Sequence, residues 1–222
     1  MTEKEKAFIL GTLIGDALGL PINRKPHHIV RMYFKGIKGY TDEYYSTATP
    51  TGLRKGQNSK DVLLLLQQLP NKNIIHAWTT LFFPPSQTYR LGLLFQSILE
   101  QDKLSVETLS EAVFAESKDK ILKSLSLFPT DLVMEFDEAM TESDAVDFAL
   151  AMLLRNHEEF ETTVLSTINM GGLTTLTGAI TGGALALLNG VQGIPQQWIE
   201  ELEHATEILN ALSIAEPLTK RE

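Results

Sequence analysis

The sequence predicts an all-α protein, a compact helical bundle that forms a single domain over residues 1–222. Two observations lead to this fold class. Apolar residues recur at the three- and four-residue spacing of amphipathic helices through most of the chain, and no segment shows the alternation of β-branched and polar residues that is typical of a sheet. A chain of 222 residues is also long enough to bury one substantial core, whereas two full domains would be tight.

Composition narrows the class of partner. The formal net charge of −9 and a pI near 5.1 argue against a surface for nucleic acid or anionic membrane, because both need basic patches. The absence of cysteine excludes disulfides, thiolate metal sites and cysteine nucleophiles. No run approaches the ~20 apolar residues of a membrane span, and the N-terminus does not resemble a signal peptide. We therefore expect a cytoplasmic protein with neither a nucleic-acid nor a membrane partner.

The first element is a helix over residues 3–20, which Pro21 ends. Its apolar positions follow helical spacing, and Gly11, Gly15 and Gly19 recur every four residues. This spacing gives the helix one bare stripe, suited to close packing or to the approach of a ligand.

Further helices follow along the chain. A short helix is expected near 26–33, and a helix over 59–69 has Ser59 as its predicted N-cap. Later helices are expected over 73–83 and 87–100, then from Ser105, Ser117, Pro129-Thr130 and Thr141–Asp144, and over 160–168. After Gly193, Pro195 starts a helix on which Trp198, Leu202, Ala205 and Ile208 share one face.

The helix over 173–189 is unusually rich in small residues and follows a double glycine, Gly171-Gly172. Glycine inside a helix costs about 1 kcal/mol relative to alanine, so this composition needs a reason. One reason is the close approach of a neighbouring helix, and we expect the 3–20 and 173–189 helices to pack through their glycine faces. The other is a ligand-facing helix N-terminus that begins at the double glycine.

Two motifs resemble the signatures of one family. Near the start stands G-x-x-x-GD-A-x-G-x-P, from Gly11 to Pro21, and near the end stands N-x-GG followed by Thr174, Gly178-Ala179, Ile194-Pro195 and Trp198. Together they resemble the ADP-ribosylglycohydrolases. The resemblance covers about the first 70 and the last 65 residues, whereas the segment 71–140 is divergent and the chain looks shortened in the middle.

The resemblance implies a site that this chain has largely lost. Family members hold two Mg²⁺ ions with five acidic residues, and these ions orient a ribose and the water that cleaves its glycosidic bond. Four of those acidic positions are here replaced, by Asn23, Lys60, Leu173 and Thr175, and Asp61 alone remains. Mg²⁺ needs hard oxygen ligands, so we expect no metal cofactor, the residual ligands being Asp61, Ser59 and Thr174.

The resulting hypothesis is a non-catalytic ADP-ribosylglycohydrolase-like protein that binds ADP-ribose, a related nucleotide or an ADP-ribosylated protein, or that acts as a regulatory module. No catalytic residue is assigned. The predicted ligand-binding residues are Asp16, Asn23, Ser59, Lys60, Asp61, Gly171, Gly172, Thr174 and Thr175. Two alternatives remain open: an active hydrolase that removes ADP-ribose from modified proteins without the standard metal centre, and a helical scaffold without a small-molecule site.

A last expectation concerns Lys60. A partly buried carboxylate without a counter-charge is driven toward protonation. We expect the Lys60 ammonium to take the electrostatic place of the metals by pairing with a carboxylate at the site, with Asp16 as its partner.

Overall fold

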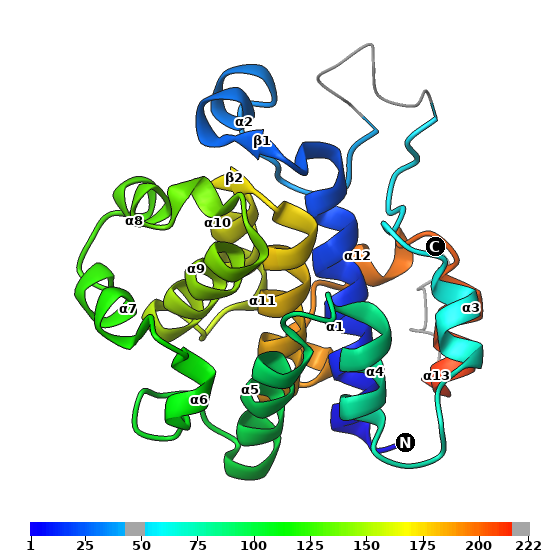
Figure 1. Cartoon of the computed structure of the whole chain (residues 1–222). Helices are drawn as coiled ribbons and strands as arrows, with labels where there is room; N and C mark the ends of the chain where they lie inside the picture. Colours follow the sequence, from blue (N-terminus) through cyan, green and yellow to red (C-terminus); the bar gives the residue numbers. More distant parts are fainter. Residues whose placement is uncertain (43–51, 215–222) are drawn as a thin grey trace.

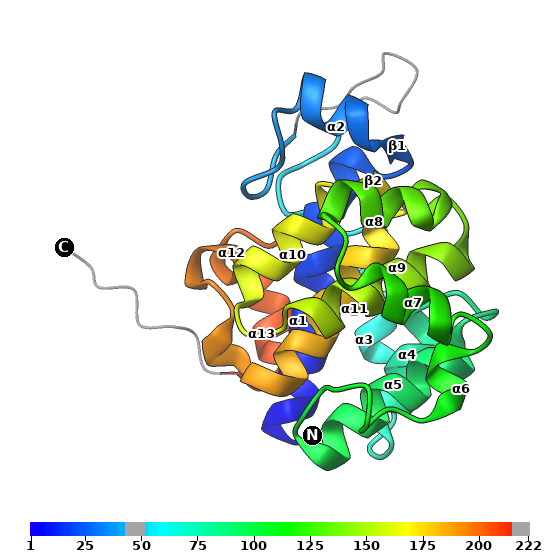
Figure 2. The same ribbon diagram turned by 90° about the vertical axis from the view of Figure 1, so that its left-hand side faces the viewer.

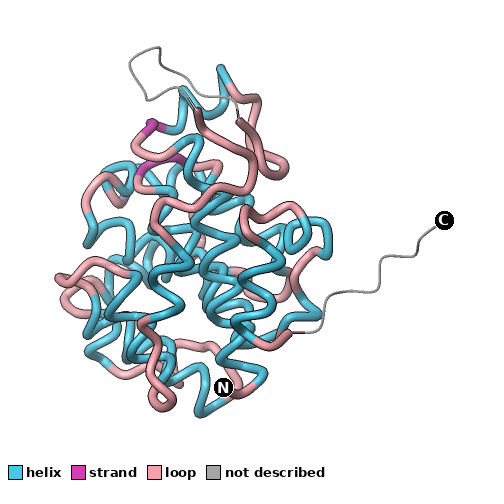
Figure 3. Tube along the Cα trace, turned by 90° about the vertical axis from the view of Figure 1, so that its right-hand side faces the viewer, coloured by secondary structure: helices cyan, strands magenta, loops and turns pink. Residues whose placement is uncertain are grey.

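The computed structural model describes residues 1–42 and 52–214. These residues confirm the all-α prediction, because helix dominates and the only strands among them are two residues long each (Figure 3). The α-helices of the described residues are α1 (Glu3–Gly19), α2 (His27–Tyr33), α3 (Val62–Gln67), α4 (Ile74–Phe82), α5 (Thr88–Gln101), α6 (Glu111–Phe114), α7 (Lys118–Ser124), α8 (Pro129–Glu135), α9 (Glu142–Arg155), α10 (Phe160–Ile168), α11 (Thr174–Asn189), α12 (Gln196–Glu200) and α13 (Ala205–Leu212).

Helices α1 and α11 lie side by side at the centre of the bundle (Figure 1). A capping box starts α1, in which the Thr2 hydroxyl accepts from the Glu5 N–H and the Glu5 carboxylate accepts from the Thr2 N–H. The two helices run antiparallel, with Gly11 against Gly182 and Gly15 against Gly178. The predicted packing through glycine faces is therefore confirmed, and it explains why α11 carries so many small residues.

The approach is too close for any side chain. A Cβ added at Gly15 would lie 1.9 Å from the Gly178 carbonyl oxygen, and one added at Gly11 would lie 2.3 Å from the Gly182 carbonyl oxygen. Helices α9 and α10 pack on the other sides of α11, and α5 also contacts it. This arrangement leaves α11 almost wholly buried, which is why its sequence lacks a polar face.

The two strands, β1 (Lys25–Pro26) and β2 (Gly171–Gly172), form an antiparallel pair at one end of the bundle (Figure 2). Lys25 is opposite Gly172 and Pro26 is opposite Gly171. Both glycines have positive φ, of 84° and 81°, which only glycine adopts without strain. The double glycine thus brings the start of α11 back against the segment that follows α1.

Three predicted elements were wrong in detail. Helix α3 begins at Val62 with Asp61 as its N-cap, because the Ser59 hydroxyl donates to Asp16 instead. No helix starts at Ser105, where the chain turns through hydrogen bonds to Thr108. The predicted C-terminal helix is divided into α12 and α13 by His204, whose φ of 61° is left-handed.

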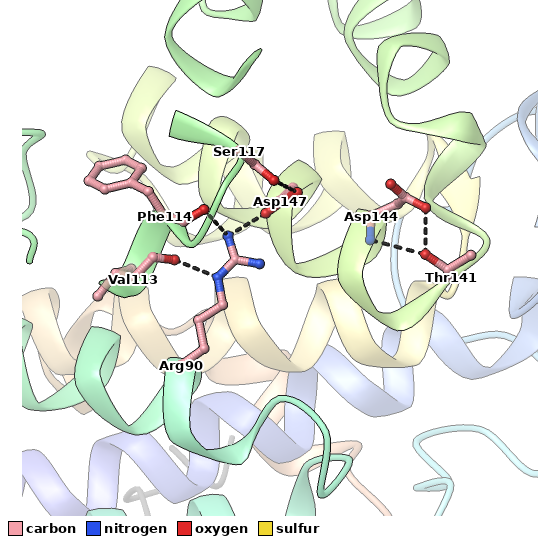
Figure 4. A network of polar contacts seen from close by, with 7 residues as sticks. All are labelled: Arg90, Val113, Phe114, Ser117, Thr141, Asp144 and Asp147. Carbon is pink, nitrogen blue, oxygen red and sulfur yellow. Dashed lines mark hydrogen bonds and ion pairs between the residues drawn. The ribbon is translucent and has the colours of Figure 1, made fainter. Parts of the chain in front are cut away.

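A buried ion pair that was not predicted from the sequence joins α5 to α9 (Figure 4). The Arg90 guanidinium contacts the Asp147 carboxylate and also donates to the carbonyls of Val113 and Phe114. Ser117 donates to the second oxygen of Asp147. The side chains of Arg90 and Asp147 are only 9% and 5% exposed, so this network ties the N-terminus of α7 and the end of α6 to the core.

In the described part of the chain, no helix is both long enough and apolar enough to cross a bilayer.

Candidate functional site

Asp16 is the buried centre of the candidate site. It lies on the last turn of α1 and is only 1% exposed. The backbone N–H and the hydroxyl of Ser59 donate to its two carboxylate oxygens at 2.7 and 2.6 Å, and the Asn58 amide donates at 3.1 Å. The predicted neighbours Asp16 and Ser59 are therefore in direct contact, although 43 residues separate them in the sequence.

Burial is the main cause of the pKa shifts of Asp16 and Lys60. It raises the pKa of Asp16, and the hydrogen bonds from Ser59 and Asn58 and the charge of Lys60 oppose that rise without cancelling it. The pKa of Lys60 is lowered by burial, against the opposing effect of the Asp16 charge. Each group is thus shifted toward its neutral form, which is the direction expected when a low-dielectric environment outweighs the attraction between opposite charges.

The prediction that Lys60 forms an ion pair with Asp16 is wrong. The Lys60 ammonium donates to the Phe82 carbonyl and stands 5.2 Å from the centre of the Phe82 ring. Within the described residues it pairs with no carboxylate, so its influence on Asp16 acts through space. The physical reason is that Ser59 and Asn58 already occupy the Asp16 oxygens, while the carbonyl at the end of α4 is free to accept.

A cavity of about 290 Å³ opens beside this centre. It brings together four of the predicted ligand-binding residues, Asp16, Ser59, Lys60 and Thr175, from α1, the loop before α3 and the start of α11. Its remaining lining residues are Phe82, Phe83, Pro84, Pro85, Glu142, Leu176 and Ala179.

Asn23 and Thr174 lie next to the cavity and make contacts within the protein. The Asn23 side-chain oxygen accepts from the Thr175 N–H at 3.5 Å, and the Thr174 hydroxyl donates to the Gly19 carbonyl at 2.7 Å. The Thr174 bond joins the start of α11 to the end of α1, and the Asn23 bond joins it to the segment that follows α1. A third bond, from the Leu173 N–H to the Ala139 carbonyl at 2.9 Å, leaves few open donors at this helix N-terminus.

Gly171 and Gly172 face backbone. A Cβ added at Gly171 would lie 2.4 Å from the Lys25 carbonyl oxygen, and one added at Gly172 would lie 2.3 Å from the Glu138 carbonyl oxygen. Neither glycine lines the cavity. Their observed role is to allow these close approaches.

Asp61 points to a second, polar cavity of about 490 Å³. This cavity shares Ser59 and Lys60 with the first and extends to Arg54 and Glu203, which form an ion pair at 2.6 Å. One Asp61 oxygen accepts from the Leu64 N–H at 3.1 Å, as the N-cap of α3. The structure thus separates Asp61 from the Asp16 cavity.

The aromatic and acidic walls of the first cavity were not predicted from the sequence. Phe82 and Phe83 end α4, and Glu142 begins α9, where Ser86 donates to its carboxylate. The one available signal was Pro84-Pro85, which fixes the loop between α4 and α5. The contact of that loop with residue 142 spans 56 residues and could not be deduced from local pattern.

The fold and this arrangement define a class: a helical bundle in which an N-terminal GD motif on one helix meets the start of a small-residue helix at a cavity. The sequence model of the ADP-ribosylglycohydrolase family matches residues 91–222, which is more than half of the chain. The chain therefore belongs to the ADP-ribosylglycohydrolase family. The match runs through most of the divergent segment 71–140, whereas the N-terminal GD motif precedes it.

A solved structure, that of an ADP-ribosylglycohydrolase-related protein complex, has the same fold. It aligns over 96% of each chain with a TM-score of 0.51 and 17% sequence identity. This neighbour is thus of similar length. No curated protein sequence matches this chain.

The residues present do not fit two magnesium ions. Among the described residues, no three His, Asp or Glu side chains gather closely enough to hold a metal ion. The Ser59 and Thr174 hydroxyls donate to Asp16 and to the Gly19 carbonyl, and one Asp61 oxygen accepts from the Leu64 N–H, so each of these groups holds a hydrogen bond within the protein. Mg²⁺ prefers near-octahedral coordination by hard oxygen atoms, and among the described residues no set of three acidic or histidine side chains converges to supply it.

Proposed function

We propose that the protein is a non-catalytic member of the ADP-ribosylglycohydrolase family that binds ADP-ribose, a related nucleotide or an ADP-ribosylated protein without Mg²⁺. One observation carries the proposal: beside the Asp16 cavity stands the Lys60 ammonium, at a position where the family resemblance implies a metal-binding carboxylate. An ammonium that lines the cavity repels a divalent cation placed there, while the cavity leaves room for an organic ligand.

The residues around the cavity support binding without hydrolysis. Leu173 and Leu176 are almost fully buried apolar residues, and Asn23 supplies an amide that cannot take a proton at neutral pH. A glycosidase needs a general acid and a base or nucleophile. Among the described residues, Asp16 is the one buried carboxyl group that lines this cavity, and its oxygens already accept three hydrogen bonds. The lack of cysteine is compatible with the cytoplasm, which we propose as its location.

A paired assay tests the proposal. The purified protein is incubated with arginine- and serine-ADP-ribosylated peptides, with and without Mg²⁺, and is titrated separately with ADP-ribose by calorimetry. We expect no release of ADP-ribose and a measurable binding heat. Release would establish the active hydrolase, and the absence of both release and binding would establish the helical scaffold.

A further inference from the structure

The Asp16 cavity carries hydrogen-bonding groups that the protein does not satisfy. Within the described residues the Thr175 hydroxyl has no hydrogen-bond partner, and the Lys60 ammonium makes one hydrogen bond, to Phe82, out of the three that it can make. Glu142, at the mouth, uses one carboxylate oxygen to accept from Ser86. A ligand in the cavity therefore meets donors from Lys60 and Thr175, and acceptors from Glu142 and Thr175.

The charges that line the cavity disfavour an anion. Two carboxyl groups, of Asp16 and Glu142, and one ammonium, of Lys60, line it, and among the described residues no arginine or histidine does. A phosphate group has only acceptor oxygens and would lie beside carboxylates that also only accept. A sugar hydroxyl both donates and accepts, so a polyhydroxylated group can satisfy Lys60, Thr175 and Glu142 together.

The size and the apolar walls of the cavity also favour a small ligand with an uncharged ring. About 290 Å³ is at the lower end of the range for small-molecule pockets, so the space suits one or two rings and not a whole dinucleotide. The apolar walls from Phe83, Pro84, Leu176 and Ala179 can cover the carbon face of a ring.

We infer that this cavity selects an uncharged polyhydroxylated ligand, such as a nucleoside or a free riboside, and that phosphate groups are kept out of it. The inference rests on the proposed function and narrows it: any phosphates of an ADP-ribose-like ligand lie outside the cavity, and a ligand without phosphates binds at least as well.

The test compares ligands that differ only in phosphate. Adenosine, AMP and ADP-ribose are titrated into the wild-type protein by calorimetry, and methyl β-ribofuranoside is added in an NMR experiment that also checks the fold. We expect adenosine to bind as tightly as AMP, within about threefold. We also expect its Kd to be insensitive to added NaCl, because salt screens charge pairs but not hydrogen bonds between uncharged groups.

Substitution of Thr175 tests whether the ligand binds in this cavity. Thr175→Val keeps the shape of the side chain and removes its hydroxyl, and the loss of one hydrogen bond weakens the binding of adenosine by about 3- to 10-fold. The matched control is Thr162→Val on α10, whose exposed hydroxyl bonds to Glu159 outside the cavity and should leave binding unchanged.

The outcomes separate the two claims. If AMP binds more than tenfold more tightly than adenosine and this advantage fades with salt, the cavity takes phosphate and the inference is overturned. If ADP-ribose binds but no uncharged riboside does, or if Thr175→Val binds adenosine like the wild type, the inference fails while the proposed function stands. If neither ADP-ribose nor any riboside binds, the proposed function itself fails.

Discussion

The substitution Gly15→Ala tests the central packing of the fold. Gly15 faces Gly178 across the α1–α11 interface, and an added Cβ would lie 1.9 Å from the Gly178 carbonyl oxygen and 2.4 Å from its carbonyl carbon. These are backbone atoms of a buried helix, so neither can swing away as the end of a side chain could. The two helices must move apart, and the layers packed on them must follow.

Two effects set the magnitude. Overpacking a core costs up to about 3 kcal/mol of folding free energy, and we assign a clash this short with backbone atoms to the upper end of that range. Alanine in a helix regains about 1 kcal/mol relative to glycine, which leaves a net loss of about 2 kcal/mol. For a chain of this size each kcal/mol lowers the melting temperature by about 2–4 °C, so thermal unfolding followed by circular dichroism should show a fall of about 4–8 °C.

Gly92→Ala is the matched control. Gly92 lies within α5, and a Cβ added there meets no atom within 4 Å. Only the gain in helix propensity remains, so the melting temperature should rise by about 2–4 °C. A Gly15→Ala protein that melts at or above the wild type, or a Gly92→Ala protein that loses as much as Gly15→Ala, would refute the reasoning.

Three further predictions concern metal, pH and the buried ion pair. Millimolar Mg²⁺ should leave the melting temperature unchanged, because the proposed function includes no Mg²⁺ site. A site filled at a hundredfold excess over Kd would instead add about 2.7 kcal/mol to the free energy of unfolding. A rise in melting temperature that Asp61→Ala abolishes would contradict this prediction. Because the pKa of Asp16 is raised above its usual 3.8, the native state retains a proton that the unfolded state releases, so its contribution to the free energy of unfolding falls as pH rises from about 4 through the raised pKa. In urea unfolding the wild-type-minus-Asp16→Asn difference should therefore decrease with pH, and an increase would show that the hydrogen bonds to the carboxylate outweigh its burial. Asp147→Leu alone should cost about 3–5 kcal/mol by leaving the Arg90 guanidinium buried without its counter-charge, whereas Arg90→Met with Asp147→Leu should recover most of that loss. Additive losses in the double variant would mean that the two side chains act independently.

The packing of α1 on α11 could be predicted from the sequence because it depends on the spacing of glycines within one helix. Gly11, Gly15 and Gly19 are four residues apart, a spacing that places them on one helix face whatever the tertiary structure. The start of α9 at Thr141 was equally readable, since its hydroxyl accepts from the Asp144 N–H three residues later.

The details of the site escaped prediction because their causes are long-range. Ser59 was a reasonable N-cap by residue type, but a buried carboxylate from α1 competes for its hydroxyl, and Asp61 then caps α3. Lys60 was expected to form an ion pair with Asp16. Its ammonium donates instead to the Phe82 carbonyl, and the Asp16 oxygens already accept other hydrogen bonds. Such competition between partners depends on distances that no sequence spacing reveals.

Calorimetric titration of ADP-ribose into the wild-type protein, once in EDTA and once in millimolar Mg²⁺, tests the central claim most directly. The claim is that the cavity beside Asp16 and Lys60 binds its ligand without metal. We predict the same Kd under both conditions, within about twofold, and no free ribose-bearing product after prolonged incubation with an ADP-ribosylated peptide. Binding that appears only with Mg²⁺, or that strengthens more than about tenfold when Mg²⁺ is added, would contradict it.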